Sequence, residues 1–396
     1  MKLTADLHLH SRYSNATSSA MDLPTMASWA RRKGIDLLGT ADFTHPVWRK
    51  ALHDQLREES EGIYTLNGMR FMITGELSLV WRHDGRGRRM HLVLLVPNLD
   101  EAERISAELG KRGNINADGR PILGLSAIDC LDLVWEQSPD TIVIPAHVWT
   151  PWYSVFGSKS GFDAMKECFG SYADRIFAIE TGLSSDPPMN RRVSALDRYT
   201  LVSNSDAHSP AKLAREATLL DLEDVSFASI AEALRTKQGY EGTLEFYPEE
   251  GKYHYDGHRK CGVSMHPAES MKHENRCPAC GKPMTLGVLH RVEKLADRAE
   301  PALDAPYRSL VPLAELIAHV LGSKGVNTKT VTTAYDSMLE RYGTELDILL
   351  EHPIDDMAAE TPDGVLEAIT NMRAGNVELI PGYDGEFGKV VLTRSE

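Results

Sequence analysis

Long apolar runs, abundant cysteine and an excess of positive charge are all missing from this sequence of 396 residues. No stretch approaches the ~20 consecutive apolar residues of a membrane-spanning helix, and the N-terminal MKLTADLHLH has no signal-peptide core. We therefore expect a cytoplasmic protein with no membrane partner. The formal net charge of −14 excludes a surface that is positive throughout. It leaves a nucleic-acid partner open, because such binding needs only a local basic surface.

The five cysteines are few and unevenly placed. Cys130 and Cys168 stand alone in helical segments, a pattern typical of buried thiols. Cys261, Cys277 and Cys280 cluster, and in a reducing compartment such a cluster favours a metal over a disulfide.

The composition is that of an ordinary globular protein, with 42% hydrophobic and 25% charged residues, and the length predicts two or three domains. The first ~240 residues alternate strand-like and helix-like segments, which predicts an α/β fold. The predicted strands are 35–39, 71–80, 91–96, 141–145, 176–179 and 201–202, and the predicted helices are 24–33, 99–109, 127–137 and 226–237. Short parallel strands separated by helices favour a closed barrel or a doubly wound sheet.

The pattern changes twice after that point. From about residue 244 to 298, His, Cys, Gly, Pro and charged residues crowd together, which indicates a small metal-stapled module. The chain then becomes helical and ends in IPGYDGEFGKVVLT, a predicted turn and strand. We therefore predict an α/β barrel over 1–243, a zinc-binding module over 244–300 and a mainly helical domain over 301–396.

Potential metal ligands stand at or near an end of each apolar run. These residues are His8, His10, Asp42, His45, Glu76, His91, His147, Glu180, Asp206 and His208. In a barrel of parallel strands the C-terminal ends open onto one face, so these side chains would converge. A single His or Asp at a strand end is usually a cap or a surface residue. The His-x-His and Asp-x-His pairs are rarer, and the whole series predicts a metal site.

The segment HRKCGVSMHPAESMKHENRCPAC indicates a second metal site. Cys277 and Cys280 form a Cys-x-x-Cys turn typical of a zinc knuckle, and Cys261 supplies a third thiolate. His258 is best placed as the fourth ligand because it mirrors the spacing of the other pair. The alternatives are His254, His266 and His273, and a surface redox pair is the competing interpretation. A closed zinc site would stabilise a small fold that has little core of its own.

The series HLH, TADFTH, GE, PAH and SDAH resembles the polymerase and histidinol phosphatase (PHP) superfamily over residues 1 to about 240. The resemblance implies a distorted seven-stranded β/α barrel with two or three divalent metals at its mouth. It implies catalytic metal roles for His8, His10, Glu76, His147, Asp206 and His208, with Asp42 in place of a histidine and His91 as a further ligand. Where the family often has another ligand, SRYSNATSS offers only Ser14 or Asn15.

Mixed sets of histidine and carboxylate suit Zn²⁺, Mn²⁺ or Fe²⁺ better than Mg²⁺, which stays among the candidate ions. Two or three such ions within ~4 Å can activate water and stabilise the entering and leaving oxygens of a phosphoryl transfer. Hydrolysis of a phosphoester is the chemistry that such a site favours.

The barrel motifs followed by EGKYHYDGHRKCGV, CPACGKPMTLGVLHRVEKLADR and IPGYDGEFGK resemble the endonuclease Q family over nearly the whole chain. That resemblance implies cleavage of DNA on the 5′ side of uracil, hypoxanthine, xanthine and abasic sites, leaving a 3′-hydroxyl and a 5′-phosphate. The implied partners are double- or single-stranded DNA with deaminated bases, and DNA repair or replication factors. We assign Asp206 as ligand and organiser of the nucleophile.

An enzyme that discriminates a damaged base generally extracts it from the stack into a pocket. Candidates for contacting that base are Ser11, Tyr13, Trp149, Trp152, Tyr153 and Ser158. Candidates for phosphate contacts are Arg82, Arg86, Arg88, Arg89, Lys252, Arg259, Lys260 and Arg291. The competing interpretation is that the aromatic residues pack the barrel rim. For the whole protein, the alternatives are a small-molecule phosphatase and an inactive DNA-binding scaffold.

Overall fold

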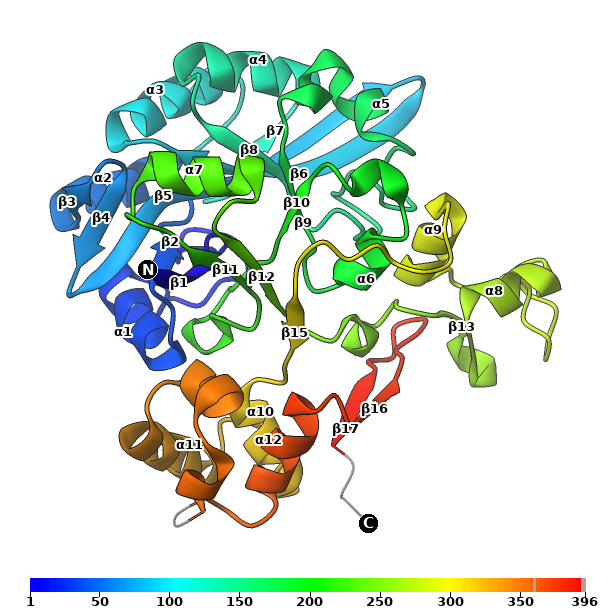
Figure 1. Ribbon diagram of the computed structural model, residues 1–396. Coiled ribbons are helices and arrows are strands. Elements are labelled where there is room, and N and C mark those ends of the chain that lie inside the picture. Colours follow the sequence, from blue (N-terminus) through cyan, green and yellow to red (C-terminus); the bar gives the residue numbers. More distant parts are fainter. Residues whose placement is uncertain (359–360, 393–396) are drawn as a thin grey trace.

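A computed structural model describes residues 1–358 and 361–392, and its N-terminal part is built on a large mixed sheet (Figure 1). The strands of this part are β1 (Lys2–Asp6), β2 (Leu37–Gly39), β3 (Arg57–Ser60), β4 (Ile63–Leu66), β5 (Met69–His83), β6 (Arg86–Val96), β7 (Ile122–Leu123), β8 (Ile142–Pro145), β9 (Ala178–Glu180), β10 (Thr200–Val202), β11 (Ala217–Asp221) and β12 (Tyr240–Glu245). The pairing order runs β12-β11-β1-β2-β5, and β6 and β8 continue it from β5.

The sheet is mixed, which corrects the prediction of parallel strands. β1, β2 and β5 pair in parallel, but β6 pairs antiparallel with both β5 and β8. The reason is a tight hairpin at Asp84 and Gly85, whose φ angles of +49° and +74° suit a turn with left-handed residues. The basic run 82–89 therefore forms the tip of a β-hairpin. Within residues 1–358 and 361–392, β9 and β10 pair only with each other, so a closed seven-stranded barrel stays a prediction.

Helices cover this sheet, and they are α1 (Leu23–Lys33), α2 (Pro46–Gln55), α3 (Leu99–Gly110), α4 (Ala127–Gln137), α5 (Met165–Phe169), α6 (Pro187–Asn190) and α7 (Phe227–Thr236). The four helices predicted from sequence are confirmed as α1, α3, α4 and α7 to within one residue at each end, whereas α2, α5 and α6 were not predicted. The Asp22 carboxylate accepts from the Thr25 N–H at the start of α1, and Gly34 ends that helix in the left-handed conformation. Ser226 and Ser229 form a reciprocal capping box on α7.

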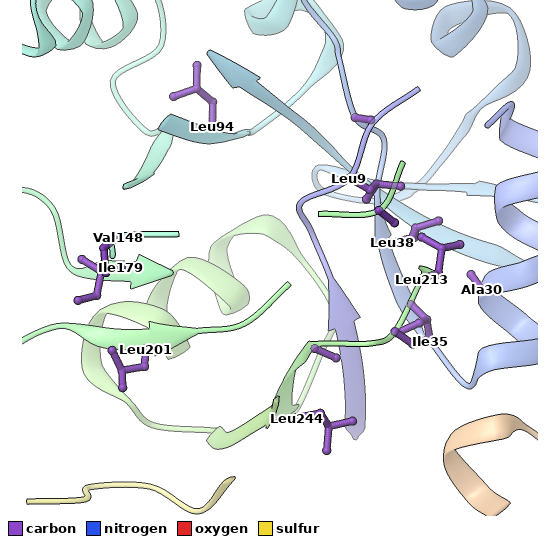
Figure 2. Close-up of a cluster of buried hydrophobic side chains, with 14 of the residues drawn as sticks. Leu9, Ala30, Ile35, Leu38, Leu94, Val148, Ile179, Leu201, Leu213 and Leu244 are labelled. Atoms are coloured by element: carbon purple, nitrogen blue, oxygen red, sulfur yellow. The ribbon is translucent and has the colours of Figure 1, made fainter. Parts of the chain in front are cut away.

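The apolar core lies in two layers. The inner layer joins strand residues such as Val93 and Ile144 to Ile230 on α7. The outer layer packs the other helices against the strands, and Figure 2 shows part of it, including Ala30 of α1 and Leu38 of β2. Several residues of α7 pack in this inner layer, among them Phe227, Ile230 and Leu234.

The rest of the chain forms a small hairpin unit and a helical tail. Its elements are β13 (Asp256–His258), β14 (Val263–Met265), α8 (Pro267–Ser270), α9 (Val288–Leu295), β15 (Tyr307–Ser309), α10 (Leu313–Val320), α11 (Lys329–Tyr342), α12 (Val365–Arg373), β16 (Val377–Ile380) and β17 (Lys389–Leu392). β15 pairs in parallel with β12, so a strand ties the tail to the main sheet. The division into three domains stays a prediction.

The tail contains more strand than the sequence predicts. β16 and β17 form an antiparallel hairpin, and only the second of these strands was expected from the pattern. Thr393, the last residue of that predicted strand, lies outside the described residues. Among residues 1–358 and 361–392, no helix has the length and apolar character needed to cross a bilayer.

Candidate metal centre

Seven of the predicted ligands converge at the open end of the strands, and we call them the metal centre. They form three overlapping groups: His8, His10 and Glu76; His10, Asp206 and His208; Glu76, His91 and His147. In each group the potential ligand atoms all lie within 4.8 Å of one another. Glu76 and His10 each belong to two groups. Because the Glu76 carboxylate has two oxygens, it could serve two adjacent cations, whereas His10 could bind one cation through Nε2.

Strand geometry explains part of this convergence. On β5, alternate residues face one side, so Glu76 follows Met72 and Thr74 on the inward face. Ser78 of β5 lies opposite His91 of β6, which places the His91 imidazole diagonally across from Glu76, with His91 Nδ1 2.7 Å from Glu76 Oε1.

Two other ligands, His147 and Asp206, stand beyond strand ends on a strained backbone. His147 follows β8 with φ +28°, and Asp206 follows β10 with φ +46°. Positive φ is uncommon outside glycine and costs energy, and such residues cluster at functional sites. Two side chains are therefore held toward the centre at the expense of local backbone stability.

Buried atoms at the centre lack the partners that buried polar groups normally have. His8 Nε2, His10 Nε2 and Asp206 Oδ1 are buried without a hydrogen bond, although His10 Nε2 lies only 3.1 Å from Asp206 Oδ1. Such orphaned atoms are rare in native proteins. Imidazole nitrogens and a carboxylate oxygen aimed at one point fit a divalent cation of the Zn²⁺ or Mn²⁺ type.

A second layer of carboxylates orients the imidazoles. Both Glu180 oxygens lie 3.0 Å from His8 Nδ1, and Glu180 also accepts from the His147 N–H at 2.8 Å and from Asn204 Nδ2 at 2.9 Å. A carboxylate on the far nitrogen fixes the tautomer and leaves Nε2 free for a metal. Glu180 thus orients the His8 imidazole, a role that the sequence alone did not assign to it.

Asp42 lies behind His10 in the same way, and its role as a ligand stays a prediction. Asp42 Oδ1 lies 3.2 Å from His10 Nδ1, and Asp42 Oδ2 accepts from the N–H and Oγ of Ser11 and from Oγ of Ser14. Asp42 belongs to none of the ligand groups formed by residues 1–358 and 361–392. Ser11 is fully buried and donates to Asp42, which contradicts its prediction as a substrate contact.

The charges at the centre balance one another. Burial alone would lower the pKa of His8 and of His10, but the surrounding carboxylates raise both well above the usual range. Against the cost of burial, the imidazoles hold the pKa of Glu76 and of Asp206 below their usual values. Burial lowers the pKa of His91 to about 4, so this imidazole is neutral. Cation binding at the centre would therefore have to displace protons.

Arg120 is a member of this neighbourhood that the sequence analysis missed. Its Nη1 lies 3.0 Å from Glu76 Oε2, and its side chain is 22% exposed. The segment around it, NADGRP, carries no pattern of metal ligands or strand alternation, so no sequence signal singled it out.

The segment 147–162, here called the aromatic loop, lies beside the centre. Tyr153 packs against His91 with ring centroids 4.5 Å apart, and Trp152 is 48% exposed. The Arg89 guanidinium lies over both rings, 4.9 Å from the Trp152 centroid and 5.5 Å from that of Tyr153. Ser158 is exposed on the same loop. Trp149 is 1% exposed and donates to Asn190, which contradicts its prediction as a pocket residue.

The remaining substrate candidates divide into exposed and engaged side chains. Tyr13 is half-buried and stacks on His45. Arg88 donates to the Gly161 carbonyl and lies over Phe162, and Arg291 is buried, so both are structural here instead of free for phosphate. The exposed candidates are Arg82, Arg86, Arg89, Lys252, Arg259 and Lys260.

The second predicted cluster also comes together. His258, Cys261, Cys277 and Cys280 have potential ligand atoms within 4.8 Å of one another, and His258 Nδ1 lies 3.5 Å from Cys280 Sγ. Three thiols and one imidazole match a structural zinc site. The alternatives stand elsewhere: His254 is buried, His266 caps α8, and His273 lies in a short turn outside this group.

Comparisons with known proteins agree with this architecture. A family model described as the MJ0043 C-terminal domain matches residues 312–376. The uncharacterized protein MJ0043 of Methanocaldococcus jannaschii is 33% identical over 251 residues, which cover 61% of this chain and 31% of that longer protein. The chain thus spans about a third of that relative. The uncharacterized protein YqxK of Bacillus subtilis is 29% identical over 98% of this chain and 99% of its own length.

Two solved structures resemble the whole chain. The lesion-specific endonuclease PfuEndoQ from Pyrococcus furiosus is 32% identical, with a TM-score of 0.88 over 99% of this chain and 95% of that one. An endonuclease Q in complex with a 27-mer duplex bearing an abasic lesion at the active site is also 32% identical, with a TM-score of 0.86 over 99% and 97%. Fold and site together define a hydrolase of the nuclease class. The chain belongs to the endonuclease Q family.

Proposed function

We propose that this protein is a metal-dependent endonuclease that hydrolyses DNA on the 5′ side of a deaminated base (uracil, hypoxanthine or xanthine) or an abasic site. The products would carry a 3′-hydroxyl and a 5′-phosphate. The observation that supports this most is the metal centre itself, where three ligand groups share Glu76 and His10 around orphaned buried atoms. Membership of the endonuclease Q family supports the choice of substrate.

The protein's own residues would hold and orient the reacting groups. Divalent ions bound at the centre would supply activation of water and neutralisation of charge on the phosphate. Glu76, His10 and the other residues of the ligand groups would hold these ions, and Asp206 would orient the attacking water toward the phosphorus. Glu180 and Asp42 would keep the His8 and His10 imidazoles in the tautomer that leaves Nε2 free.

The substrate would approach along the aromatic loop. Trp152, Tyr153 and Arg89 form a stacked cation–aromatic surface next to His91, and such surfaces bind unstacked bases. Exposed cations on the β5–β6 hairpin tip and near residue 259 would contact the DNA backbone, where each contact adds salt dependence. We expect Trp152→Ala to weaken cutting at uracil while metal content stays unchanged.

One assay tests the proposal. Purified protein with Mn²⁺ or Mg²⁺ is incubated with matched duplexes that hold uracil or thymine at one position, and Asp206→Asn serves as the inactive control. We expect a nick 5′ of uracil, none at thymine and none with the variant. Release of phosphate from a small ester without a nick would favour a phosphatase, and binding without cleavage would favour a scaffold.

A further inference from the structure

A permanent cation stands at the mouth of the metal centre. Arg120 Nη1 lies 3.0 Å from Glu76 Oε2, and the same oxygen lies 3.3 Å from His10 Nε2. A guanidinium does not lose its proton in proteins. Arg120 therefore carries its charge next to the carboxylate that two ligand groups share.

Arg120 lies in a segment that hydrogen bonds fix in place, residues 114–121, which we call the strap. The strap is fixed on three sides: the Gly119 N–H donates to the Tyr13 carbonyl at 2.9 Å, Thr44 Oγ1 donates to the Gly119 carbonyl at 3.1 Å, and the Ser78 N–H donates to the Pro121 carbonyl at 3.0 Å. Arg120 is thus not a loosely attached surface side chain.

Glycine is required at residue 119, where the strap packs against Asp42 and Ser14 behind His10. A Cβ at Gly119 would lie 2.2 Å from Asp42 Oδ2 and 2.5 Å from Ser14 Oγ, closer than atoms can approach. The missing side chain lets the strap press directly onto Asp42 and sets the position of the next residue. Gly119, which precedes Arg120, thus packs on Asp42 and Ser14, the two residues that contact His10 Nδ1.

The hydrogen bonding of this guanidinium is incomplete. In the described part of the chain its side-chain hydrogen bonding runs through Nη1 to Glu76, which leaves the Nη2 and Nε donors of the fork for another acceptor. A cation beside a site for divalent ions is favourable when an anion lies between them. A phosphate oxygen is such an anion, and the guanidinium fork matches its geometry.

We propose that Arg120 is a catalytic residue that binds a non-bridging oxygen of the scissile phosphodiester and stabilises the charge that develops on phosphorus. This inference rests on the proposed function, because it assumes that the ester bound at the centre is a phosphodiester. Arg120 would donate to the oxygen that faces the strap, while the ligand groups lie on the opposite side. Its contribution would appear in the chemical step, since the charge on the oxygens grows in the transition state.

Cleavage and metal content separate a phosphate contact from a purely structural role. For Arg120→Met we expect the single-turnover rate at uracil to fall about 10²–10³-fold, with unchanged metal content by elemental analysis. Arg120→Lys should recover part of the rate, because it restores the charge without the fork. Loss of the centre's metals in Arg120→Met would overturn the proposal and make Arg120 a partner of Glu76 only.

A binding measurement gives a second readout that needs no cleavage. In an Asp206→Asn background, we compare duplexes whose scissile linkage is a phosphodiester or an uncharged methylphosphonate. Adding Arg120→Met should reduce the preference for the phosphodiester by about tenfold, whereas Arg82→Met at the hairpin tip should weaken both duplexes equally. An unchanged preference would overturn the role of Arg120. Failure of the wild type to nick uracil would instead refute the proposed function and leave this comparison to decide on Arg120.

Discussion

The two candidate metal sites of this chain are built in opposite ways. The metal centre takes its ligands from residues 8 to 208, buries most of them, and shares Glu76 and His10 between groups. The candidate zinc site takes its potential ligands from residues 258 to 280, leaves Cys261 and Cys280 exposed, and shares none. Closed sites with four protein ligands stabilise folds, whereas sites with shared ligands and unfilled positions perform chemistry. Ligand sharing, not burial alone, distinguishes the two.

The two sites are nevertheless joined by a short series of contacts. Zinc-site residue His258 lies on β13 with Asp256, whose buried carboxylate pairs with His290 of α9 at 2.6 Å. The next residue, Arg291, donates to the carbonyls of Phe156 and Phe162, each at 2.8 Å. The unit that carries the candidate zinc site therefore anchors the far end of the aromatic loop, whose other end carries His147.

The largest effect should come from Glu76→Gln, which removes the carboxylate shared by two ligand groups. We expect cutting at uracil to fall by at least about 10³-fold and the centre to lose its metals, while one zinc per chain remains. Elemental analysis and a nicking assay measure both. The exposed Glu103→Gln on α3 is the matched control. Retention of full metal content would mean that Glu76 is not a shared ligand.

Cys277→Ser should remove the zinc of the candidate zinc site, while the metals of the metal centre stay bound. Without zinc the small unit around β13 and β14 has little core, so we expect α9 to loosen its hold on the aromatic loop. Cutting should fall about 10–100-fold through misplaced loop residues. Zinc counts, nicking rates and limited proteolysis near residue 270 test this, with Lys282→Met as the control. Loss of the centre's metals together with the zinc would show that the two sites are not separate.

Arg291→Lys should reproduce the loop effect with zinc still bound. Lysine keeps the charge but cannot donate to two carbonyls through a planar fork. We expect a loss of about tenfold in cutting, and faster exchange of amide hydrogens in the aromatic loop. Lys294→Met, an exposed neighbour on α9, should change neither. If exchange in the loop does not change, the connection between the two regions is absent.

Many of the potential ligands of both sites could be predicted from sequence. His-x-His, Asp-x-His and Cys-x-x-Cys place side chains at fixed short spacings that local geometry preserves. What could not be predicted depends on tertiary contacts. The pattern predicts Asp42 as a ligand, but in the structure its Oδ2 accepts from the hydroxyls of Ser11 and Ser14 and its Oδ1 lies beside His10 Nδ1. Arg120 carries no local signal, since the strap around Gly119 places it.

The antiparallel β5–β6 hairpin was detectable and missed. Asp84-Gly85 between two apolar runs is a strong hairpin signal, because both residues readily adopt the left-handed conformation that a two-residue turn requires. Trp149 shows the opposite error: an aromatic residue next to a ligand is a reasonable pocket candidate, but its indole N–H has a buried partner in Asn190. Burial of single side chains is decided by packing that no short motif records.

The one prediction that concerns stability and not cutting separates the two regions by their response to pH, and it concerns Glu245 on β12. Burial raises its pKa to about 8 from an ordinary 4.5. The folded state therefore holds a proton that the unfolded chain has lost, so this contribution to stability is complete below pH 4.5 and disappears as the pH rises to about 8. In that window the free energy of unfolding should fall by about 1.4 kcal/mol per pH unit from this group.

Glu245→Gln tests this directly, because glutamine cannot ionise and can still bond the hydroxyls of Ser203 and Thr243. Chemical denaturation of the variant should show a shallower fall in stability between pH 6 and 8 than the wild type, with similar stability at pH 5. Zinc retention should move the other way, because protons compete with zinc for thiolates as the pH falls. If the free energy of unfolding falls with pH equally in variant and wild type, Glu245 does not cause the fall. Only the candidate zinc site would then respond to pH.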